Sequence, residues 1–310
     1  MFNLFEAIKT NLTKPKPLKT DRIPTHMPSR AMCNSVVDGR PIGHCLRAAY
    51  LSRMQYPVSN PLGVYTIMTT EAGRLWEYWL TNQFKELGLY LDHSVKLYDP
   101  TSFISGEIDI IHFNPETDKV ELTECKQYNG SNYYAASELT GNSKTAPKPK
   151  DQNLLQCFEY LIMCRNTGND LEHINLVYID RSCANFSNNV QFRISLKEVK
   201  GEVHPRIEYF NSKGEVEEYT DFRITETAIL NKNEVLDQCV EAQRIPMRDY
   251  SHQYAYEVIQ DMVSKKEISA ARLTKWQQDP IKNPIGDWQC RFCPYGPNLE
   301  NQSTCYSIEQ

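Results

Sequence analysis

Three features that mark other classes of protein are missing from this sequence of 310 residues. It has no apolar run long enough to cross a membrane, and its first twelve residues lack the continuous hydrophobic core of a cleavable signal. It is also not basic, since 34 lysine and arginine residues stand against 39 acidic residues and the net charge is −5. This balance argues against a protein that coats DNA, but not against an enzyme with a local basic groove.

The sequence also lacks internal repeats and low-complexity tracts. Its length predicts one large domain, or one domain with an appendage. A chain of this length buries enough apolar surface to fold without disulfide bonds, so its ten cysteines need another explanation.

What the sequence does contain is a predicted β-hairpin with residues 106–113 and 120–126 as its strands. Two apolar runs flank a polar segment with Asn-Pro and Asp-Lys pairs, which is typical of a hairpin turn. Side chains alternate between the two faces of a strand. A pairing of Phe113 with Val120 would therefore set which polar side chains face one another.

In that register Asp109 lies opposite Glu124, with Lys126 two residues further along the same face. Two facing carboxylates repel unless a cation lies between them, and oxygen ligands suit Mg²⁺ or Mn²⁺. Such an ion can deprotonate water and neutralise charge on a phosphate, while the lysine orients the water or stabilises the phosphorus. The alternative is a solvated hairpin, because Glu-x-Lys triplets are common and residues 198–200 form a second one.

Two predicted helices distinguish the first triplet from the second. Residues 65–87 predict a long amphipathic helix, whose apolar stripe is Met68, Ala72, Leu75, Trp76, Trp79 and Leu87. On its flank, Glu77 faces partly inward, and Gly73 one turn earlier would let another backbone approach closely. Residues 151–165 predict a second helix with Gln156 and Tyr160 on one face.

The order of these motifs resembles the PD-(D/E)xK nuclease superfamily, specifically its RecB-like branch: Gly-x-x-x-Glu, Gly-x-x-Asp, Glu-x-Lys and Gln-x-x-x-Tyr. The resemblance implies a divalent-metal site with the ligands Glu77, Asp109, Glu124 and the main-chain carbonyl of Cys125. It implies that Lys126 is catalytic, and that Gln156 and Tyr160 help to hold the DNA or the lysine. The family often has histidine in place of Glu77, which leaves the number of metal ions open.

The cysteines provide a second, independent pattern. Cys290 and Cys293 form a C-x-x-C pair, a spacing that lets two thiolates bind one metal centre. Cys305 follows in a loop rich in Gly, Pro, Asn and Ser. A fourth ligand is required, and Cys45, at the start of a predicted helix, is the candidate, with Cys33 as its rival.

One cysteine before the nuclease-like core and three after it resemble the iron–sulfur nucleases of the same branch, such as the CRISPR-adaptation exonucleases and the AddB-type subunits. The resemblance implies a 4Fe-4S cluster that joins the two ends of the chain beside the DNA channel. Its ligands would be Cys45, Cys290, Cys293 and Cys305, although the gap before Cys305 is longer than in that family. Zinc, a redox-active C-x-x-C and free thiols remain alternatives, because spacing alone does not identify the metal.

A basic segment, residues 144–150, follows the hairpin in the sequence, and its prolines favour an extended loop. Its Lys148 and Lys150 are candidates for phosphate contacts. The alternative is a solvated connector, because charge runs usually face water.

The patterns and the resemblance together imply an α/β fold with a restriction-endonuclease-like central mixed sheet flanked by helices, and a metal-stapled subdomain joining the N- and C-terminal segments. The predicted parts are an N-terminal extension and linker (1–30), the first part of the cysteine-cluster subdomain (31–60), the nuclease core with an inserted or added sheet around 181–223 (61–265), and the C-terminal cysteine segment (266–310). The extension begins with an apolar peptide, Phe2 to Ile8, that either packs on its own domain or docks a partner.

The expected function is metal-dependent hydrolysis of DNA, with exonuclease action favoured over endonuclease action by analogy alone. Two other functions stay open. One is a nuclease subunit that works with a helicase, an annealing protein or an integration complex, and the other is a non-catalytic DNA-binding scaffold. Thiols that hold a cluster need a reducing compartment, so a cytoplasmic location is expected.

Overall fold

The computed structural model describes residues 9–12, 14, 25–131, 133–141, 145–169, 171–183, 185–211, 213–297 and 303–308. The chain divides into two compact units, here called unit 1 (Met1–Pro17, His44–Val64 and Glu234–Gln310) and unit 2 (Leu18–Gly43 and Tyr65–Asn233). Residues 31–43, predicted to belong with the cysteine segments, fall in unit 2, and residues 234–265 fall in unit 1. The apolar peptide Phe2 to Ile8, most of the linker after it, and Lys144 lie outside the described residues.

Unit 2 is built on one seven-stranded mixed sheet, which confirms the predicted α/β class with a mixed sheet flanked by helices. In spatial order its strands are β3 (Tyr90–Asp99), β4 (Ile104–Asn114), β5 (Lys119–Tyr128), β6 (His173–Asp180), β7 (Val190–Val199), β8 (Glu202–Phe210) and β9 (Val216–Thr220). In this sheet β5 and β6 run parallel, and every other neighbouring pair is antiparallel. Strands β7 to β9 continue the same sheet, so the segment around 181–223 does not form a second one.

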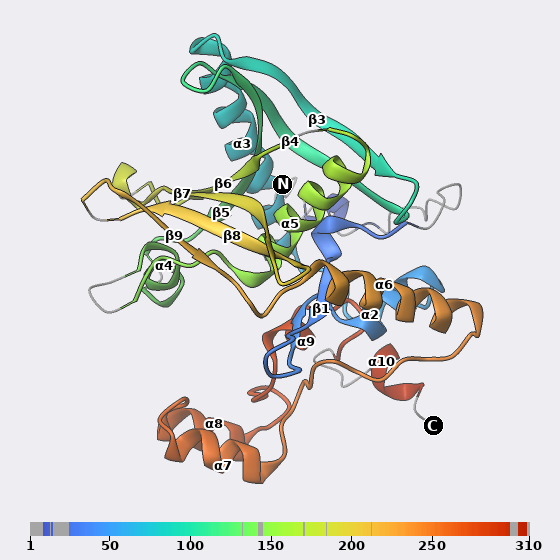
Figure 1. Cartoon of the computed structure of the whole chain (residues 1–310). Helices are drawn as coiled ribbons and strands as arrows, with labels where there is room; N and C mark the ends of the chain where they lie inside the picture. The colour runs from blue at the N-terminus through green and yellow to red at the C-terminus, as the bar shows by residue number, and fades with distance from the viewer. Residues whose placement is uncertain are drawn as a thin grey trace. The chain divides into compact units, whose positions relative to one another are not determined.

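One helix lies on each side of β4 and β5 (Figure 1). Helix α5 (Asp151–Asn166) follows β5 and the short helix α4 (Tyr133–Thr140), leads into β6, and is buried from Leu154 to Cys164. Helix α3 (Val64–Glu86) packs on the other side, where the Phe84 ring stacks on His112 at 4.4 Å. The Gln127 amide also donates a hydrogen bond to the Thr69 carbonyl of α3, at 2.5 Å.

Much of the apolar stripe predicted for α3 faces solvent, although Ala72 and Trp76 are partly buried. The side chains of Met68, Leu75 and Leu87 are 59%, 70% and 69% exposed. The inward side carries Glu77, Leu80 and Phe84 instead. Spacing shows which residues share a helix face, but the sheet selects the face that it contacts.

The close approach predicted at Gly73 is made by a side chain and not by a backbone. A Cβ at Gly73 would lie 3.2 Å from the Gln127 amide nitrogen. The glycine therefore leaves room for the glutamine that ties β5 to α3.

A small hairpin, β1 (Met32–Asn34) and β2 (Pro41–Gly43), follows the short helix η1 (Pro28–Arg30) and packs against α5. At Gly43, φ is +86°, and a Cβ would lie 2.3 Å from the Ala31 carbonyl and 2.6 Å from Leu155. Only glycine fits this approach. This close contact with Leu155 of α5 explains why residues 31–43 belong to unit 2. A second short helix, η2 (Phe186–Asn188), precedes β7.

Unit 1 is made of short helices. They are α2 (Leu46–Arg53), the end of α6 (Glu226–Glu241), α7 (Tyr256–Ser264), α8 (Ala270–Gln278), α9 (Trp288–Arg291) and α10 (Thr304–Ser307). The buried guanidinium of Arg47 holds three segments together, because it donates to the carbonyls of Pro246 at 2.7 Å and Cys305 at 3.1 Å. In the described part of the chain, no helix combines the length and apolar character of a membrane span.

Candidate metal and thiol sites

The predicted hairpin forms in the predicted register. Phe113 pairs with Val120 and Ile111 with Leu122 across β4 and β5. The paired ladder ends at Ile110 and Thr123, one pair before Asp109 and Glu124. Beyond it, an Asp109 carboxylate oxygen accepts a hydrogen bond from the Cys125 N–H at 2.7 Å. Asp109 therefore lies against the backbone of the Glu-x-Lys triplet.

Glu124 is almost fully buried and only half satisfied. Its Oε1 accepts hydrogen bonds from the Lys126 ammonium at 2.5 Å and from the Gln156 amide at 2.7 Å. Its Oε2 is buried and has no hydrogen-bond partner among the residues that the structure describes. A buried polar atom without a partner is costly, so this oxygen is suited to accept a hydrogen bond or to coordinate a cation.

Three carboxyl groups lie near Lys126, those of Glu77, Asp109 and Glu124. Burial and the charge of neighbouring carboxylates raise the pKa of each. Burial raises the pKa of Glu124 to about 8, and the charge of Asp109 adds to the rise, which Lys126 opposes. Burial and Asp109 together raise the pKa of Glu77, on α3, to about 7. The pKa of Asp109 is also raised, first by burial. Full ionisation of the three carboxyl groups would leave negative charge that one lysine does not balance.

Lys126 stays protonated in this environment. Burial acts to lower its pKa, but the attraction of Glu124 and Asp109 outweighs that effect and raises the pKa above its ordinary value. The lysine is therefore a donor and a fixed positive charge, and it is not suited to take up a proton.

The donor set fits a hard divalent cation. Within the described ranges, no three histidine, cysteine, aspartate or glutamate side chains are arranged to hold a metal ion. Mg²⁺, however, is usually held by one or two carboxylates and completes its shell with water. Asp109 and Glu124 match that pattern, and a cation would offset both the burial and the repulsion from neighbouring carboxylates that raise their pKa values.

Gln156 and Tyr160 project from α5 toward the same strands. Gln156 holds the Glu124 carboxylate directly, and its amide is 3.4 Å from the Tyr160 hydroxyl. That hydroxyl donates to the Glu107 carbonyl of β4 at 2.7 Å. The two residues thus fix the carboxylate and the strand that carries Asp109.

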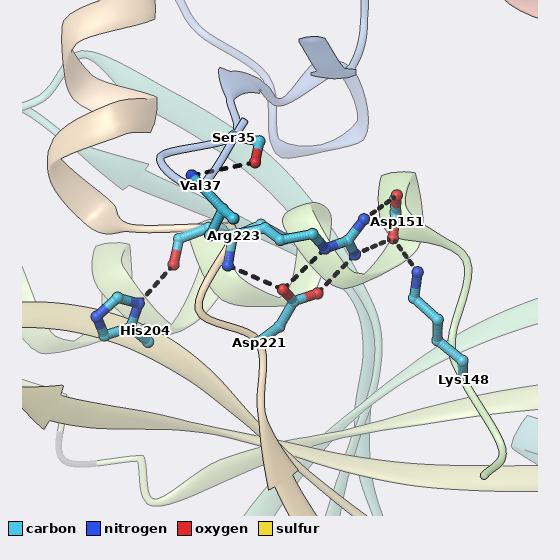
Figure 2. Close-up of polar contacts among 8 residues, drawn as sticks. Ser35, Val37, Lys148, Asp151, His204, Asp221 and Arg223 are labelled. Carbon is cyan, nitrogen blue, oxygen red and sulfur yellow. Dashed lines mark hydrogen bonds and ion pairs between the residues drawn. The ribbon is translucent and has the colours of Figure 1, made fainter. Parts of the chain in front are cut away.

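Lys148 and Lys150 lie in different surroundings, although the sequence made both candidates for phosphate contacts. The Lys148 ammonium lies 3.2 Å from Asp151, which also receives two hydrogen bonds from Arg223 (Figure 2). Arg223 binds Asp221 as well, so Lys148 joins a network that anchors the start of α5. Lys150 makes no such pair in the described residues, and burial lowers its pKa.

The four predicted cluster cysteines lie in one neighbourhood of unit 1. Cys45 immediately precedes α2, Cys290 and Cys293 lie in and after α9, and Cys305 is in α10. Burial raises the pKa of Cys293 to about 11, and the nearby Cys45 and Cys305 add to the rise. Burial and the same two cysteines also raise the pKa of Cys290. These four thiols are neighbours, but within the described residues they do not form a group arranged to bind a metal ion.

Cys33, the rival candidate for the fourth ligand, lies in different surroundings from the other four cysteines. It is a fully buried residue of β1 in unit 2, within the apolar core that contains α5. Burial raises its pKa, and the charged groups that act on it are Asp151, Lys232, Asp221 and Arg223. The cysteines that act on one another are those of unit 1.

Two histidines that are isolated in the sequence meet in the fold. His112 pairs with Glu121 across β4 and β5, and His173 Nε2 lies 3.1 Å from a Glu121 carboxylate oxygen. Asn114 and Asn175 donate to the same carboxylate at 2.6 and 2.7 Å. Applying the predicted register one pair further would have found the first contact. The arrangement is a satisfied buried carboxylate, consistent with a structural role.

Comparisons of the chain with protein-family models and with curated proteins gave no match. Function is therefore inferred from the residues and geometry above.

Proposed function

We propose that this chain is a divalent-metal-dependent nuclease of the PD-(D/E)xK type, RecB-like branch, which hydrolyses phosphodiester bonds of DNA from strand ends. The observation that carries the proposal is the convergence of Asp109, Glu124 and Lys126 in unit 2, with the buried Glu124 Oε2 left without a partner. Carboxylates of raised pKa beside a lysine that remains charged suit a site for an anionic substrate and a cation.

In this proposal Asp109, Glu124 and the Cys125 carbonyl hold Mg²⁺ or Mn²⁺, and Glu77 supports them. The ion, when bound, lowers the pKa of a water molecule and neutralises charge on the phosphate. Glu124 keeps the Lys126 ammonium protonated. Lys126 can therefore donate a hydrogen bond to a phosphate oxygen or to the attacking water. Gln156 keeps the Glu124 carboxylate in one orientation.

The finer fold assignment belongs to the same proposal. All four motifs lie on elements that adjoin one another in unit 2, in the order α3, β4, β5 and α5. This supports a restriction-endonuclease-like arrangement, in which the hairpin carries the ligands and the helices supply Glu77 and Gln156.

We further propose that Cys45, Cys290, Cys293 and Cys305 hold a structural 4Fe-4S cluster, with zinc as the competing metal. The shared neighbourhood of the four thiols in unit 1 supports this. Protein purified without oxygen should show broad absorption near about 400 nm, and iron and sulfide in equal amounts. A colourless protein with one bound zinc would replace the cluster by a zinc site.

Cleavage of end-labelled single- and double-stranded DNA with Mg²⁺ or Mn²⁺ tests the activity. Lys126→Ala and Glu124→Gln should each reduce the rate by about 100-fold or more, because charge-stabilising groups at a reacting phosphate contribute on this scale. The second triplet offers matched controls, since Glu198 and Lys200 are exposed. Glu198→Gln and Lys200→Ala should cleave like the wild type. No cleavage by the wild type under any condition would favour the scaffold function.

A further inference from the structure

Two positive side chains lie close together where the parallel strands β5 and β6 end. Arg181 directly follows β6, and its N–H donates to the Tyr128 carbonyl, the last residue of β5, at 3.0 Å. Lys150 directly precedes α5. Burial lowers its pKa most, Glu138 acts to raise it, and the charge of Arg181, the smallest of the three effects, lowers it. The carboxyl ends of parallel strands are the usual place for ligands in α/β proteins.

In the described residues, Lys150 and Arg181 form no ion pair. The exposed Glu138 attracts Lys150 and raises its pKa, and this effect is larger than the opposite effect of Arg181. Two like charges held together without an anion are unfavourable, so the pair suits a bound anion. The start of α5, a helix of 16 residues, adds its positive end at Lys150.

The pair is rigidly connected to the proposed active site. Tyr178 of β6 is the strand partner of Lys126, and it is fully buried. Its hydroxyl accepts hydrogen bonds from the Lys150 N–H at 3.1 Å and from the Asn153 amide at 2.8 Å. Arg181 lies three residues beyond Tyr178, about 10 Å along the strand direction.

An exposed aromatic ring completes this surface. Tyr65, near the start of α3, is 74% exposed, and its hydroxyl accepts a 3.4 Å hydrogen bond from the Arg181 guanidinium. An exposed ring beside a cation is how proteins bind unpaired nucleotides, because the ring stacks on the base while the cation contacts the phosphate.

We propose that Lys150 and Arg181 bind a backbone phosphate of single-stranded DNA next to the bond being cleaved, and that Tyr65 stacks on a neighbouring base. The inference deepens the proposed nuclease function, on which it rests, by assigning an unpaired strand as the substrate at this point. Arg181 and Tyr65 would then be specificity residues that the sequence patterns did not reveal.

Binding of a fluorescein-labelled thymidine oligonucleotide, measured by anisotropy in EDTA over a range of salt concentrations, tests the inference without requiring cleavage. Arg181→Ala and Lys150→Ala should each weaken binding by about tenfold and reduce the slope of log Kd against log salt by about 0.7, the value for one single-strand phosphate contact. Tyr65→Leu should weaken single-strand binding about tenfold but leave blunt duplex binding unchanged, and Tyr65→Phe should retain it.

Controls come from the exposed turn region between β8 and β9. Lys213→Ala and Phe210→Ala remove an exposed cation and an aromatic ring that is 59% exposed, and neither should alter binding. Wild-type affinity and salt slope for Arg181→Ala would overturn the inference, as would a wild-type protein that binds no single-stranded DNA. A protein that binds as expected but does not cleave would instead refute the nuclease function alone.

Discussion

The carboxyl site of unit 2 and the thiol site of unit 1 are built in different ways. In unit 2, Asp109, Glu124 and Lys126 lie on neighbouring strands, where backbone hydrogen bonds set their spacing. In unit 1, Cys45 directly precedes α2, Cys290 and Cys305 lie in the four-residue helices α9 and α10, and Cys293 lies just after α9. Such short helices have little stability of their own.

The difference predicts how each site depends on its ligand. The sheet holds its carboxylates together even when they repel, so the carboxyl site should keep its shape without an ion. The thiol site has no comparable framework, so metal binding there should supply part of the folding free energy. Changes in the first site should therefore affect activity, and changes in the second should affect stability.

The largest expected effect is on activity, from Glu124→Gln. The rate should fall by about 100-fold or more, while the melting temperature measured without metal should fall only slightly. The ion pair with Lys126 is lost, but the glutamine oxygen still accepts a hydrogen bond from the Lys126 ammonium. Parallel rate assays and calorimetry will check this. A melting temperature that falls by many degrees would show that the sheet does not hold this site by itself.

The second effect is on stability, from Cys290→Ser combined with Cys293→Ser. Losing metal ligands should destabilise unit 1 by several kcal/mol. Hydrogen exchange should then increase across residues 234–297 and stay unchanged in β4 and β5. Cys183→Ser, at an exposed cysteine of unit 2, is the control and should change neither region. Unchanged protection of unit 1 in the double variant would contradict a structural metal.

A third prediction separates burial from like-charge repulsion. Glu159 of α5 is fully buried, which raises its pKa from 4.5 to about 7, while an amide hydrogen bond from Asn233 at 3.3 Å opposes the rise. No second carboxyl contributes to this shift. The folded state binds this proton more tightly than the unfolded chain, so the contribution to stability is present below about pH 4.5 and is lost as the pH rises through about 7.

Glu159→Gln should therefore be more stable than the wild type above about pH 8, by up to about 3 kcal/mol, and should show a flatter dependence of unfolding free energy on pH. Urea unfolding from pH 5 to 9 measures this, with the exposed Glu198→Gln as the control. An equal slope for Glu159→Gln and wild type would mean that Glu159 does not hold its proton in the folded protein.

The smallest effect is expected on the solvent side of α3. Leu75 is 70% exposed, whereas Leu155 of α5 is fully buried. Leu75→Ala should change the unfolding free energy by no more than about 0.5 kcal/mol, and Leu155→Ala should cost about 2–5 kcal/mol. Chemical denaturation of both variants compares them. A large loss for Leu75→Ala would restore the orientation of α3 that its sequence pattern predicted.

The fold was predictable where local rules apply. The hairpin register followed from strand alternation and from the turn, and helix α5 began at the predicted residue, Asp151. Strand β3 was not predicted, and neither was the pairing of β7 to β9 with the central sheet. Those contacts depend on partners far away in the sequence, and no local pattern specifies them.

The candidate site shows the same division. Asp109, Glu124, Lys126, Gln156 and Tyr160 were all named from spacing, and the structure brings them together. Arg181 and Tyr65 were not named from the sequence. They become neighbours only in the fold, where the end of β6 lies near the start of α3. Lys148 and Lys150 share one basic run, yet only Lys148 has an acidic partner, Asp151, at ion-pair distance in the described residues.

The sequence by itself determined which side chains share a strand or helix face, because the periods of strands and helices depend only on backbone geometry. It also determined, through the C-x-x-C spacing, that Cys290 and Cys293 are close enough to bind a single metal centre. Only the tertiary structure decided which side chains of α3 are buried, and that Cys33 belongs to the core of unit 2 while Cys45 neighbours the other thiols. It also decided that Glu124 Oε2 has no partner within the described part of the chain. Burial and charge balance are sums over neighbours from distant segments, so they exist only once those segments have packed.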